Sequence, residues 1–215
     1  MVITFLNSFV CSATAVNLSS PTLFRSWKST KLASHLRTTI VEAARATSAA
    51  PTFFRSVEIV GDEGLPETFI DGGMLANNPV KFVLGQAEEI FPNSNIDYVL
   101  SLGTGEPSVI KINVHDSPFK RFLPTNIILV KALVEIATDC ESTADEVERK
   151  FSDTPGVYYR LNVNRGLEEV SLSEWTKLTS VVAHTRAYLG KEDVHKKVIN
   201  LVQKLYQTSS LGTEA

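Results

Sequence analysis

The stretch that decides the fold is Phe-Ile-Asp-Gly-Gly-Met-Leu-Ala-Asn-Asn-Pro at residues 69–79. Asp71 directly follows a strand-like apolar run, with Gly72 and Gly73 behind it. A carboxylate at the C-terminal end of a strand lies on the edge where α/β sheets build their sites. Glycines let the chain turn sharply and let other groups approach closely. A plain Asp-Gly turn, which only reverses the chain, is the alternative.

Strands and helices are predicted to alternate along the chain. Asn78 suits the N-cap of a helix, Pro79 its first position, and this helix should stop before Pro92. Further helices are expected at about 124–150, 173–189 and 194–206, and strands at 8–16, 58–60, 68–70, 96–100 and 157–163. Such alternation predicts the α/β class with a largely parallel sheet.

The helix that precedes Pro51 has a defined start and end. Thr38 or Thr39 suits its N-cap, and the helix must stop before the proline. Its periodicity places three small or branched residues among the buried positions, namely Val41, Ala44 and Ala49.

Composition limits the class of protein. The chain has 215 residues, of which 43% are hydrophobic, so it is neither disordered nor of low complexity, and it fits one domain or most of one. The net charge of −3 lacks the basic excess of a nucleic-acid-binding protein. Residues 1–60 carry six basic and two acidic residues, so they could face anionic lipid headgroups or form an ordinary solvated surface.

Cysteine and histidine spacing suggests no metal site and no disulfide framework. Cys11 and Cys140 lie far apart, which favours an intracellular, reducing setting. The apolar N-terminus lacks a positively charged start, and no run reaches the ~18 apolar residues of a membrane helix. We therefore expect a soluble protein. The four histidines lack metal-ligand spacing; they are His35, His115, His184 and His195.

Three runs, in order, carry a family resemblance. They are Ala43–Phe54, residues 69–79 and Val99–Gly105, and together they resemble patatin-like phospholipases, particularly those akin to calcium-independent phospholipase A. Leu23–Trp27 is similar to a further segment of that family. The resemblance extends from about residue 9 to 206, and the later part looks like fungal members at Tyr159–Leu167, Trp175 and His184–Leu189.

The resemblance implies a three-layer α/β/α fold and a lipid acyl hydrolase that works with a Ser–Asp dyad. In such enzymes a serine in a Gly-x-Ser-x-Gly elbow attacks the ester carbonyl, and a glycine-rich loop stabilises the oxyanion. Asp71 would be the proton acceptor, with Gly72, Gly73 and Asn78 supporting its loop. A base is needed because a serine hydroxyl is a weak nucleophile. Neither a metal nor a cofactor is expected.

The sequence departs from the family pattern at the nucleophile. None of its eleven glycines brackets a serine as Gly-x-Ser-x-Gly, and the oxyanion glycine run is missing. Both should lie upstream of the first strand. We therefore expect an incomplete patatin-like domain at residues 1–206, with a helical part at about 123–206 and a flexible tail at 207–215.

No other serine replaces the nucleophile well. Ser101 stands before Gly103 and Gly105, but it lacks a preceding glycine and an obvious following helix, which the elbow needs. Ser48 is expected to pack or cap at a helix end. Arg45 and Arg55 could contact a headgroup phosphate or pair with a carboxylate.

Two functional hypotheses follow. In the first, the chain is a shortened or truncated part of a patatin-like hydrolase that acts on lipid or phospholipid esters at a membrane surface. In the second, it is an inactive remnant that binds lipid or protein, or completes another chain. Both are compatible with a cytoplasmic location, or one peripheral to membranes. The 215 residues alone are predicted to be inactive, because the nucleophile is absent from them.

Overall fold

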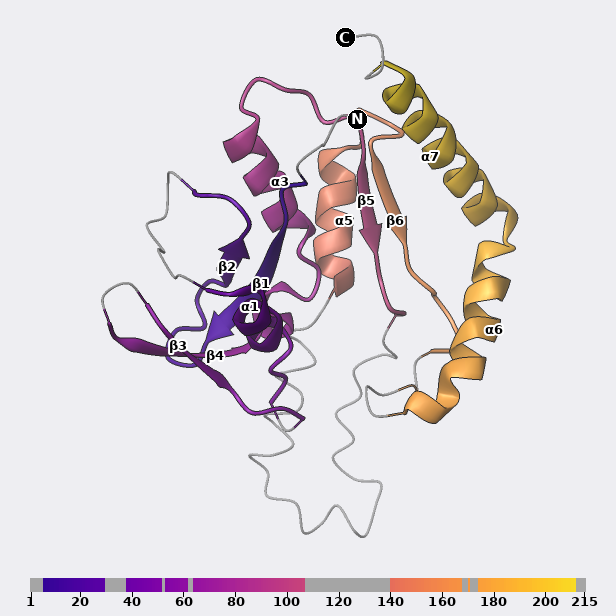
Figure 1. Ribbon diagram of the computed structural model, residues 1–215. Coiled ribbons are helices and arrows are strands. Elements are labelled where there is room, and N and C mark those ends of the chain that lie inside the picture. Colours follow the sequence, from indigo (N-terminus) through magenta and orange to yellow (C-terminus); the bar gives the residue numbers. More distant parts are fainter. Residues whose placement is uncertain are drawn as a thin grey trace. The chain divides into compact units, whose positions relative to one another are not determined.

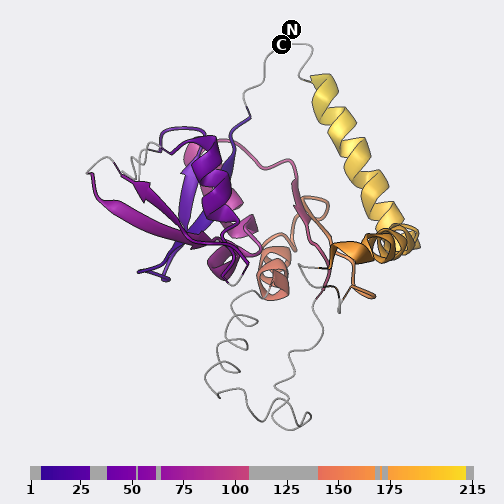
Figure 2. The same cartoon turned by 60° about the horizontal axis from the view of Figure 1, so that its bottom comes forward.

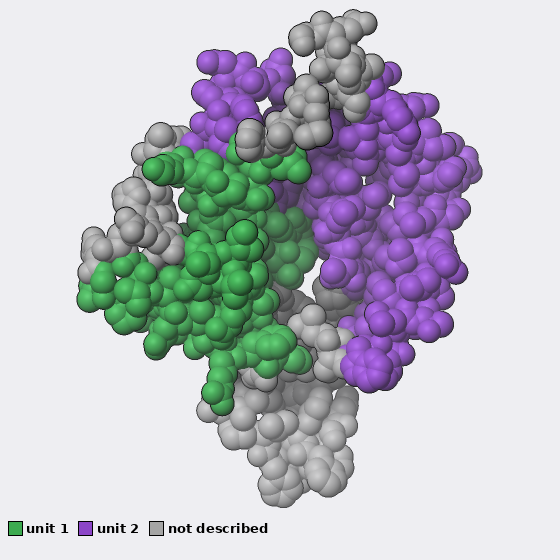
Figure 3. All heavy atoms as spheres, viewed as in Figure 1, with its two compact units in different colours: residues 1–79, 117–140 green, residues 80–116, 141–215 purple. Residues whose placement is uncertain are grey.

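The computed structural model describes residues 6–29, 38–51, 53–61, 64–106, 140–167, 170 and 174–211. These residues form two compact units, coloured in Figure 3. The described residues up to Pro79, together with Cys140, belong to unit 1, and those of 80–106 and 141–211 to unit 2. The sequence predicted one partial domain over 1–206.

Unit 1 contains a four-stranded sheet in the order β2-β1-β4-β3 (Figures 1 and 2). All three pairings are antiparallel. Its strands are β1 (Phe9–Thr14), β2 (Thr22–Arg25), β3 (Val57–Val60) and β4 (Pro66–Asp71). The strands predicted at 8–16, 58–60 and 68–70 are confirmed, whereas β2 was not assigned from the sequence.

The helix α1 (Ile40–Thr47) confirms the predicted cap and end. Thr39 and Glu42 form a capping box, in which the threonine hydroxyl accepts from the Glu42 N–H and the carboxylate accepts from the Thr39 N–H. The predicted buried face is wrong at Val41 and Ala44, which are exposed. The helix turns Ala46 toward the sheet instead, where its side chain is fully buried in the core of unit 1.

The core of unit 1 lies between α1 and one face of the sheet. Phe24 and Phe69, on β2 and β4, meet edge to face with ring centroids 5.2 Å apart, a favourable aromatic geometry. The remaining buried members of this core are Ala46, Ala49, Val57 and Ile59. A one-turn helix, α2 (Gly73–Ala76), follows β4.

Unit 2 contains a parallel pair of strands with helices around it. Residues Val99–Leu102 form β5 and Tyr158–Leu161 form β6. The helices are α3 (Val80–Ile90), α5 (Cys140–Lys150), α6 (Leu178–Leu189) and α7 (Glu192–Leu211), with a short 3-10 turn, η2 (Trp175–Lys177), before α6. The first half of the helix predicted at 124–150 lies outside the described residues.

One face of the parallel pair packs on α3 and α5. Val80, Leu84, Val99 and Val147 are buried together there, with Phe151 and Tyr158 packed against them. The helix α7 packs against β6. It ends at Leu211, so the helix includes the first part of the segment 207–215 that was expected to be a flexible tail.

The expected largely parallel sheet needs correction. The described strands form one antiparallel sheet and one parallel pair, so three of their four pairings are antiparallel. The chain between β3 and β4 is short enough for a hairpin, and hairpin neighbours are antiparallel. The α/β class itself holds. None of the helices in the described ranges combines the length and apolar composition that a membrane span requires.

Candidate active site

Asp71 is the last residue of β4, in register with Ser12 of β1. Its backbone N–H donates to the Ala49 carbonyl over 3.0 Å, just beyond the end of α1. The carboxylate oxygen Oδ1 accepts from the Gly73 N–H at 2.5 Å, which closes a tight turn. Backbone bonds on both sides therefore fix the position of this half-buried carboxylate.

Gly72 is required by close backbone packing. A Cβ at this position would lie 2.0 Å from the Cys11 carbonyl oxygen, far inside contact distance. The same carbonyl accepts from the Thr47 hydroxyl at 2.6 Å. The turn after Asp71 is thus pressed against β1 and the end of α1, and only glycine allows that approach.

Ser12 is a positioning residue that the sequence reading missed. It is fully buried, and its hydroxyl lies 2.7 Å from the Ile70 carbonyl oxygen and 3.2 Å from that of Ala46. The bond to Ile70 ties β1 to the residue before Asp71. A serine inside the otherwise apolar run of β1 was the available signal, because a buried hydroxyl needs a partner.

The two other predicted support residues have distinct positions. Gly73 supplies the N–H that Asp71 accepts, and a Cβ there would lie 2.9 Å from the aspartate Oδ1. Asn78 is buried, and its side-chain amide donates to the Cys140 carbonyl at 3.1 Å. The helix α3 starts at Val80, so Asn78 stands two residues before it and anchors the chain there.

Among the described residues, the turn engages only one of the two carboxylate oxygens of Asp71. Oδ1 is occupied by the Gly73 N–H, whereas Oδ2 of Asp71 makes no hydrogen bond within the described ranges. An ionised carboxylate has lone pairs on both oxygens, so Oδ2 can take a proton while Oδ1 fixes the group. Nearby, burial raises the pKa of the Cys11 thiol to about 11, so this thiol stays protonated at neutral pH.

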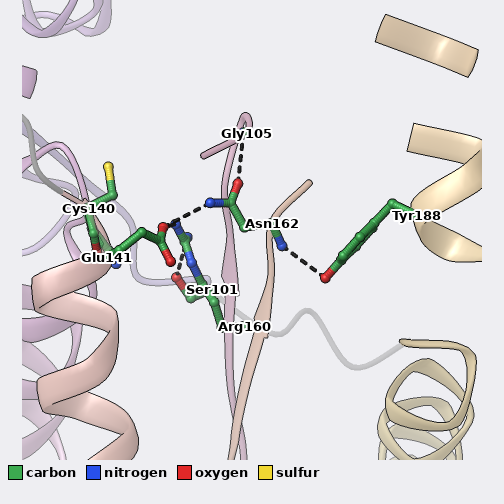
Figure 4. Close-up of polar contacts among 8 residues, drawn as sticks. Ser101, Gly105, Cys140, Glu141, Arg160, Asn162 and Tyr188 are labelled. Atoms are coloured by element: carbon green, nitrogen blue, oxygen red, sulfur yellow. Dashed lines mark hydrogen bonds and ion pairs between the residues drawn. The ribbon is translucent and has the colours of Figure 1, made fainter. Parts of the chain in front are cut away.

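Ser101 belongs to a structural network, shown in Figure 4. It is buried on β5, and its hydroxyl accepts from Arg160 Nη1 at 3.1 Å. Nη2 of the same guanidinium pairs with Glu141 at 2.7 Å. A guanidinium is a cation and cannot take the serine proton, so this contact favours packing over nucleophilic chemistry.

Asn162 is the centre of that network. Its amide donates to Glu141 at 2.8 Å, its carbonyl oxygen accepts from the Gly105 N–H at 2.7 Å, and its backbone N–H donates to the Tyr188 hydroxyl. A Cβ on Gly103 would lie 2.2 Å from the Asn162 oxygen. The glycines after β5 therefore receive the side chain of the residue that directly follows β6.

The remaining candidates from the sequence are one serine, two arginines and the histidines. Ser48 caps the end of α1 through a bond to the Ala44 carbonyl, as expected, and Arg45 and Arg55 are exposed. His184 is half-buried, His195 is exposed, and His35 and His115 lie outside the described residues. Within the ranges that the structure covers, no three His, Cys, Asp or Glu side chains are grouped to hold a metal ion.

The fold and the turn define an α/β protein with a carboxylate fixed at a strand end. Residues 9–84 match the model of the family described as patatin-like phospholipase. This match and the relatives below confirm the resemblance of the chain to patatin-like phospholipases.

Three relatives illustrate the likeness. The 85/88 kDa calcium-independent phospholipase A2 of Rattus norvegicus is 30% identical over 152 residues, which cover 60% of this chain and 18% of the relative. Calcium-independent phospholipase A2-gamma of Mus musculus is 38% identical over 122 residues, or 56% and 14%. Phospholipase A I of Arabidopsis thaliana is 26% identical over 147 residues, or 66% and 10%. The chain thus spans less than a fifth of these relatives' lengths.

Proposed function

We propose that this chain is the aspartate-bearing part of a patatin-like lipid acyl hydrolase, with Asp71 as its proton acceptor. The observation that carries the proposal is the turn after β4, where Oδ1 is held by the Gly73 N–H and Oδ2 has no hydrogen bond to the residues that the structure describes. This turn lies inside residues 9–84, the part that matches the family. Three relatives are named as phospholipases, which supports a lipid ester as substrate.

The proposed step needs a serine that the 215 residues do not present in a Gly-x-Ser-x-Gly elbow. As the serine oxygen bonds to the ester carbonyl carbon, its O–H bond breaks and the proton passes to Asp71 Oδ2. The carbonyl oxygen becomes negative and needs fixed backbone donors. Gly72, Gly73 and Asn78 hold the loop and take no proton themselves.

A second candidate function is a lipid- or protein-binding module without catalysis. It is favoured by one observation, the absence of a Gly-x-Ser-x-Gly segment from the 215 residues. Either function would place the protein in the cytoplasm or at a membrane surface. The two differ in whether the protein isolated from its source carries a reactive serine.

The test starts from the native protein, captured with an antibody to residues 191–215. Its mass, its labelling by a fluorophosphonate and its hydrolysis of phosphatidylcholine vesicles are measured. We expect labelling and turnover, with turnover reduced at least ~100-fold in Asp71→Asn because a general base is lost. Glu67→Gln is the matched control, since Glu67 is an exposed carboxylate on the same strand.

Three results would contradict the proposal. They are no fluorophosphonate labelling of the captured protein, equal turnover in wild type and Asp71→Asn, or equal losses in Asp71→Asn and Glu67→Gln. The recombinant 215-residue chain is expected to show no turnover above background. Turnover by that chain would mean that another of its residues is the nucleophile.

A further inference from the structure

The C-terminal end of α1 accepts hydrogen bonds from the Asp71 turn. The last carbonyls of an α-helix have no partner within the helix. In this protein the carbonyl of Thr47, the last residue of α1, accepts from the Gly72 N–H at 3.4 Å. The carbonyl of Ala49, two residues further on, accepts from the Asp71 N–H at 3.0 Å. Two successive N–H groups of the turn therefore bond to the end of α1.

The side chain of Thr47 adds a bond from α1 to β1. Thr47 is half-buried, and its hydroxyl donates to the Cys11 carbonyl oxygen at 2.6 Å. A serine or threonine in a helix can instead bond back to a carbonyl of its own helix. The adjacent Ser48 does so, with the Ala44 carbonyl at 2.7 Å. Thr47 directs its hydroxyl out of the helix, so it joins α1 to the sheet.

Thr47 bonds to both partners of a close backbone contact at the turn. This contact is between Gly72 and the Cys11 carbonyl, where a Cβ on the glycine would lie 2.0 Å from the oxygen. The Thr47 hydroxyl holds the carbonyl of Cys11, and the Thr47 carbonyl holds the N–H of Gly72. Gly72 lies between Asp71 and Gly73, whose N–H binds Oδ1 of the carboxylate. A shift of Gly72 would therefore move the carboxylate.

We infer that Thr47 is a positioning residue for proton transfer to Asp71, with its hydroxyl holding the turn that orients the carboxylate. The inference rests on the proposed function, in which the serine proton passes to Oδ2. Thr47 takes no proton in that step, because its hydroxyl donates to a backbone carbonyl. Its contribution is geometric, since a displacement of about 1 Å in a reacting group can cost about a hundredfold in rate.

The test compares three variants of the full protein, made in its source cells and captured with the antibody to residues 191–215. Thr47→Val removes the hydroxyl and keeps the branched shape, whereas Thr47→Ser keeps the hydroxyl. Ser48→Ala is the matched control, because it removes the neighbouring hydroxyl, which bonds to carbonyls of α1 and not to the sheet. Hydrogen exchange followed by mass spectrometry is measured on peptides from the turn and from β3. Hydrolysis of phosphatidylcholine vesicles gives kcat and KM.

In Thr47→Val we expect the turn amides to exchange at least ~10-fold faster than in wild type, because their acceptors at the end of α1 are no longer fixed to β1. Exchange in β3 should not change, whereas a general loss of stability in unit 1 would raise both. The kcat should fall at least ~10-fold and KM should stay within about twofold, since only the geometry of the reacting carboxylate is altered. Thr47→Ser and Ser48→Ala should both resemble wild type.

Turn amides that exchange equally in Thr47→Val and wild type would overturn the inference. Equal acceleration in the turn and β3 would also overturn it, because Thr47 would then act on stability alone. So would an unchanged kcat in Thr47→Val when Asp71→Asn loses turnover, or equal losses in Thr47→Val and Ser48→Ala. Turnover that is absent, or insensitive to Asp71→Asn, would contradict the proposed function instead. The exchange measurements would then still decide whether the Thr47 hydroxyl holds the turn.

Discussion

Each unit has a glycine-containing loop at the end of a strand, and the two loops are held in place by different means. The loop of unit 1 follows Asp71, and the loop of unit 2 follows β5 and contacts Asn162. In unit 1 the backbone does it, because Gly72 is pressed against the Cys11 carbonyl and Gly73 donates to Asp71. In unit 2 a side chain does it, because Asn162 accepts from Gly105 and donates to Glu141. The first loop should be sensitive to one added carbon atom, and the second to the loss of one amide.

Gly72→Ala tests the first half of that comparison and should have the largest effect. The added Cβ would lie 2.0 Å from the Cys11 carbonyl oxygen, so β1 and the turn must separate. We expect a loss of at least ~3 kcal/mol in the free energy of unfolding of unit 1. Trp27, which packs edge to face on Phe9 of β1, reports that unfolding by its fluorescence in urea. Trp175→Phe removes the other tryptophan, which is 77% exposed.

Gly85→Ala is the matched control for the added carbon. Gly85 lies within α3, and a Cβ there would meet nothing within 4 Å. Alanine is the better helix former, so this variant should add about 0.5–1 kcal/mol to the free energy of unfolding of unit 2, which contains α3, and leave the Trp27 transition of unit 1 unchanged. Equal stabilities of Gly72→Ala and wild type would show that the Asp71 turn is looser than its contacts imply.

Asn162→Ala tests the second half and should have the next largest effect. It leaves Glu141 and the Gly105 N–H without their amide partner in a partly buried setting, which costs about 2 kcal/mol. Far-UV circular dichroism in urea measures it, since most of the helical residues in the described ranges belong to unit 2. The control is Asn164→Ala, an exposed asparagine bonded to Lys191, which should change stability by less than ~0.5 kcal/mol. A loss of equal size in both variants would contradict the prediction.

Features with local causes could be predicted from the sequence. The capping threonine, the helix ends before Pro51 and Pro92, and the Asp71 turn each depend on residues a few positions apart. Propensities of caps, prolines and Asp-Gly turns act at that range, so a pattern in the sequence is sufficient to find them.

Features set by distant neighbours could not be predicted in the same way. The antiparallel sheet follows from which strands meet, and the exposure of Val41 from which face of α1 meets that sheet. Nothing near Gly72 in the sequence indicates that the Cys11 carbonyl lies against it. Likewise Glu141 and Asn162 are separated in the sequence by most of α5, a loop and β6, so their bond is visible only after folding.

Thr39→Ala removes a side-chain cap in unit 1, the unit whose loop is held by the backbone. It should reduce the free energy of unfolding by less than Gly72→Ala or Asn162→Ala. Loss of an N-cap threonine costs about 1 kcal/mol. A backbone hydrogen bond from Thr39, and then one from its side chain, lowers the pKa of Glu42 below its usual value. The folded form therefore favours the ionised carboxylate, and the stability that this provides is present above the unfolded pKa of about 4.5 and lost as the pH falls through the folded value.

This pH dependence is measured by urea unfolding of wild type and Glu42→Gln at several pH values between acid and neutral, with Trp27 fluorescence as the signal. The deficit relative to wild type should be present at neutral pH and shrink as the solution becomes more acid than the Glu42 pKa. Glu58→Gln, at an exposed carboxylate on β3 of the same unit, is the control and should show no such change. A deficit for Glu42→Gln that is constant with pH would contradict the reciprocal cap.

Lys81→Gln should have the smallest effect, because it removes a pair that water already screens. Lys81 on α3 and Glu146 on α5 form an ion pair in which both side chains are well exposed, and their hydrogen bond lowers the pKa of Glu146. The stabilisation is thus present at neutral pH, lost as the pH falls below the usual carboxylate range, and weakened by salt. Circular dichroism in urea should show a smaller loss of stability than that of Thr39→Ala, and the loss caused by Lys81→Gln should disappear at about 1 M salt.

The deficit of Asn162→Ala should persist there, because that amide is buried and uncharged. If both deficits disappear together, unit 2 is held by charge rather than by the amide, and its contrast with the backbone-held turn of unit 1 must be redrawn.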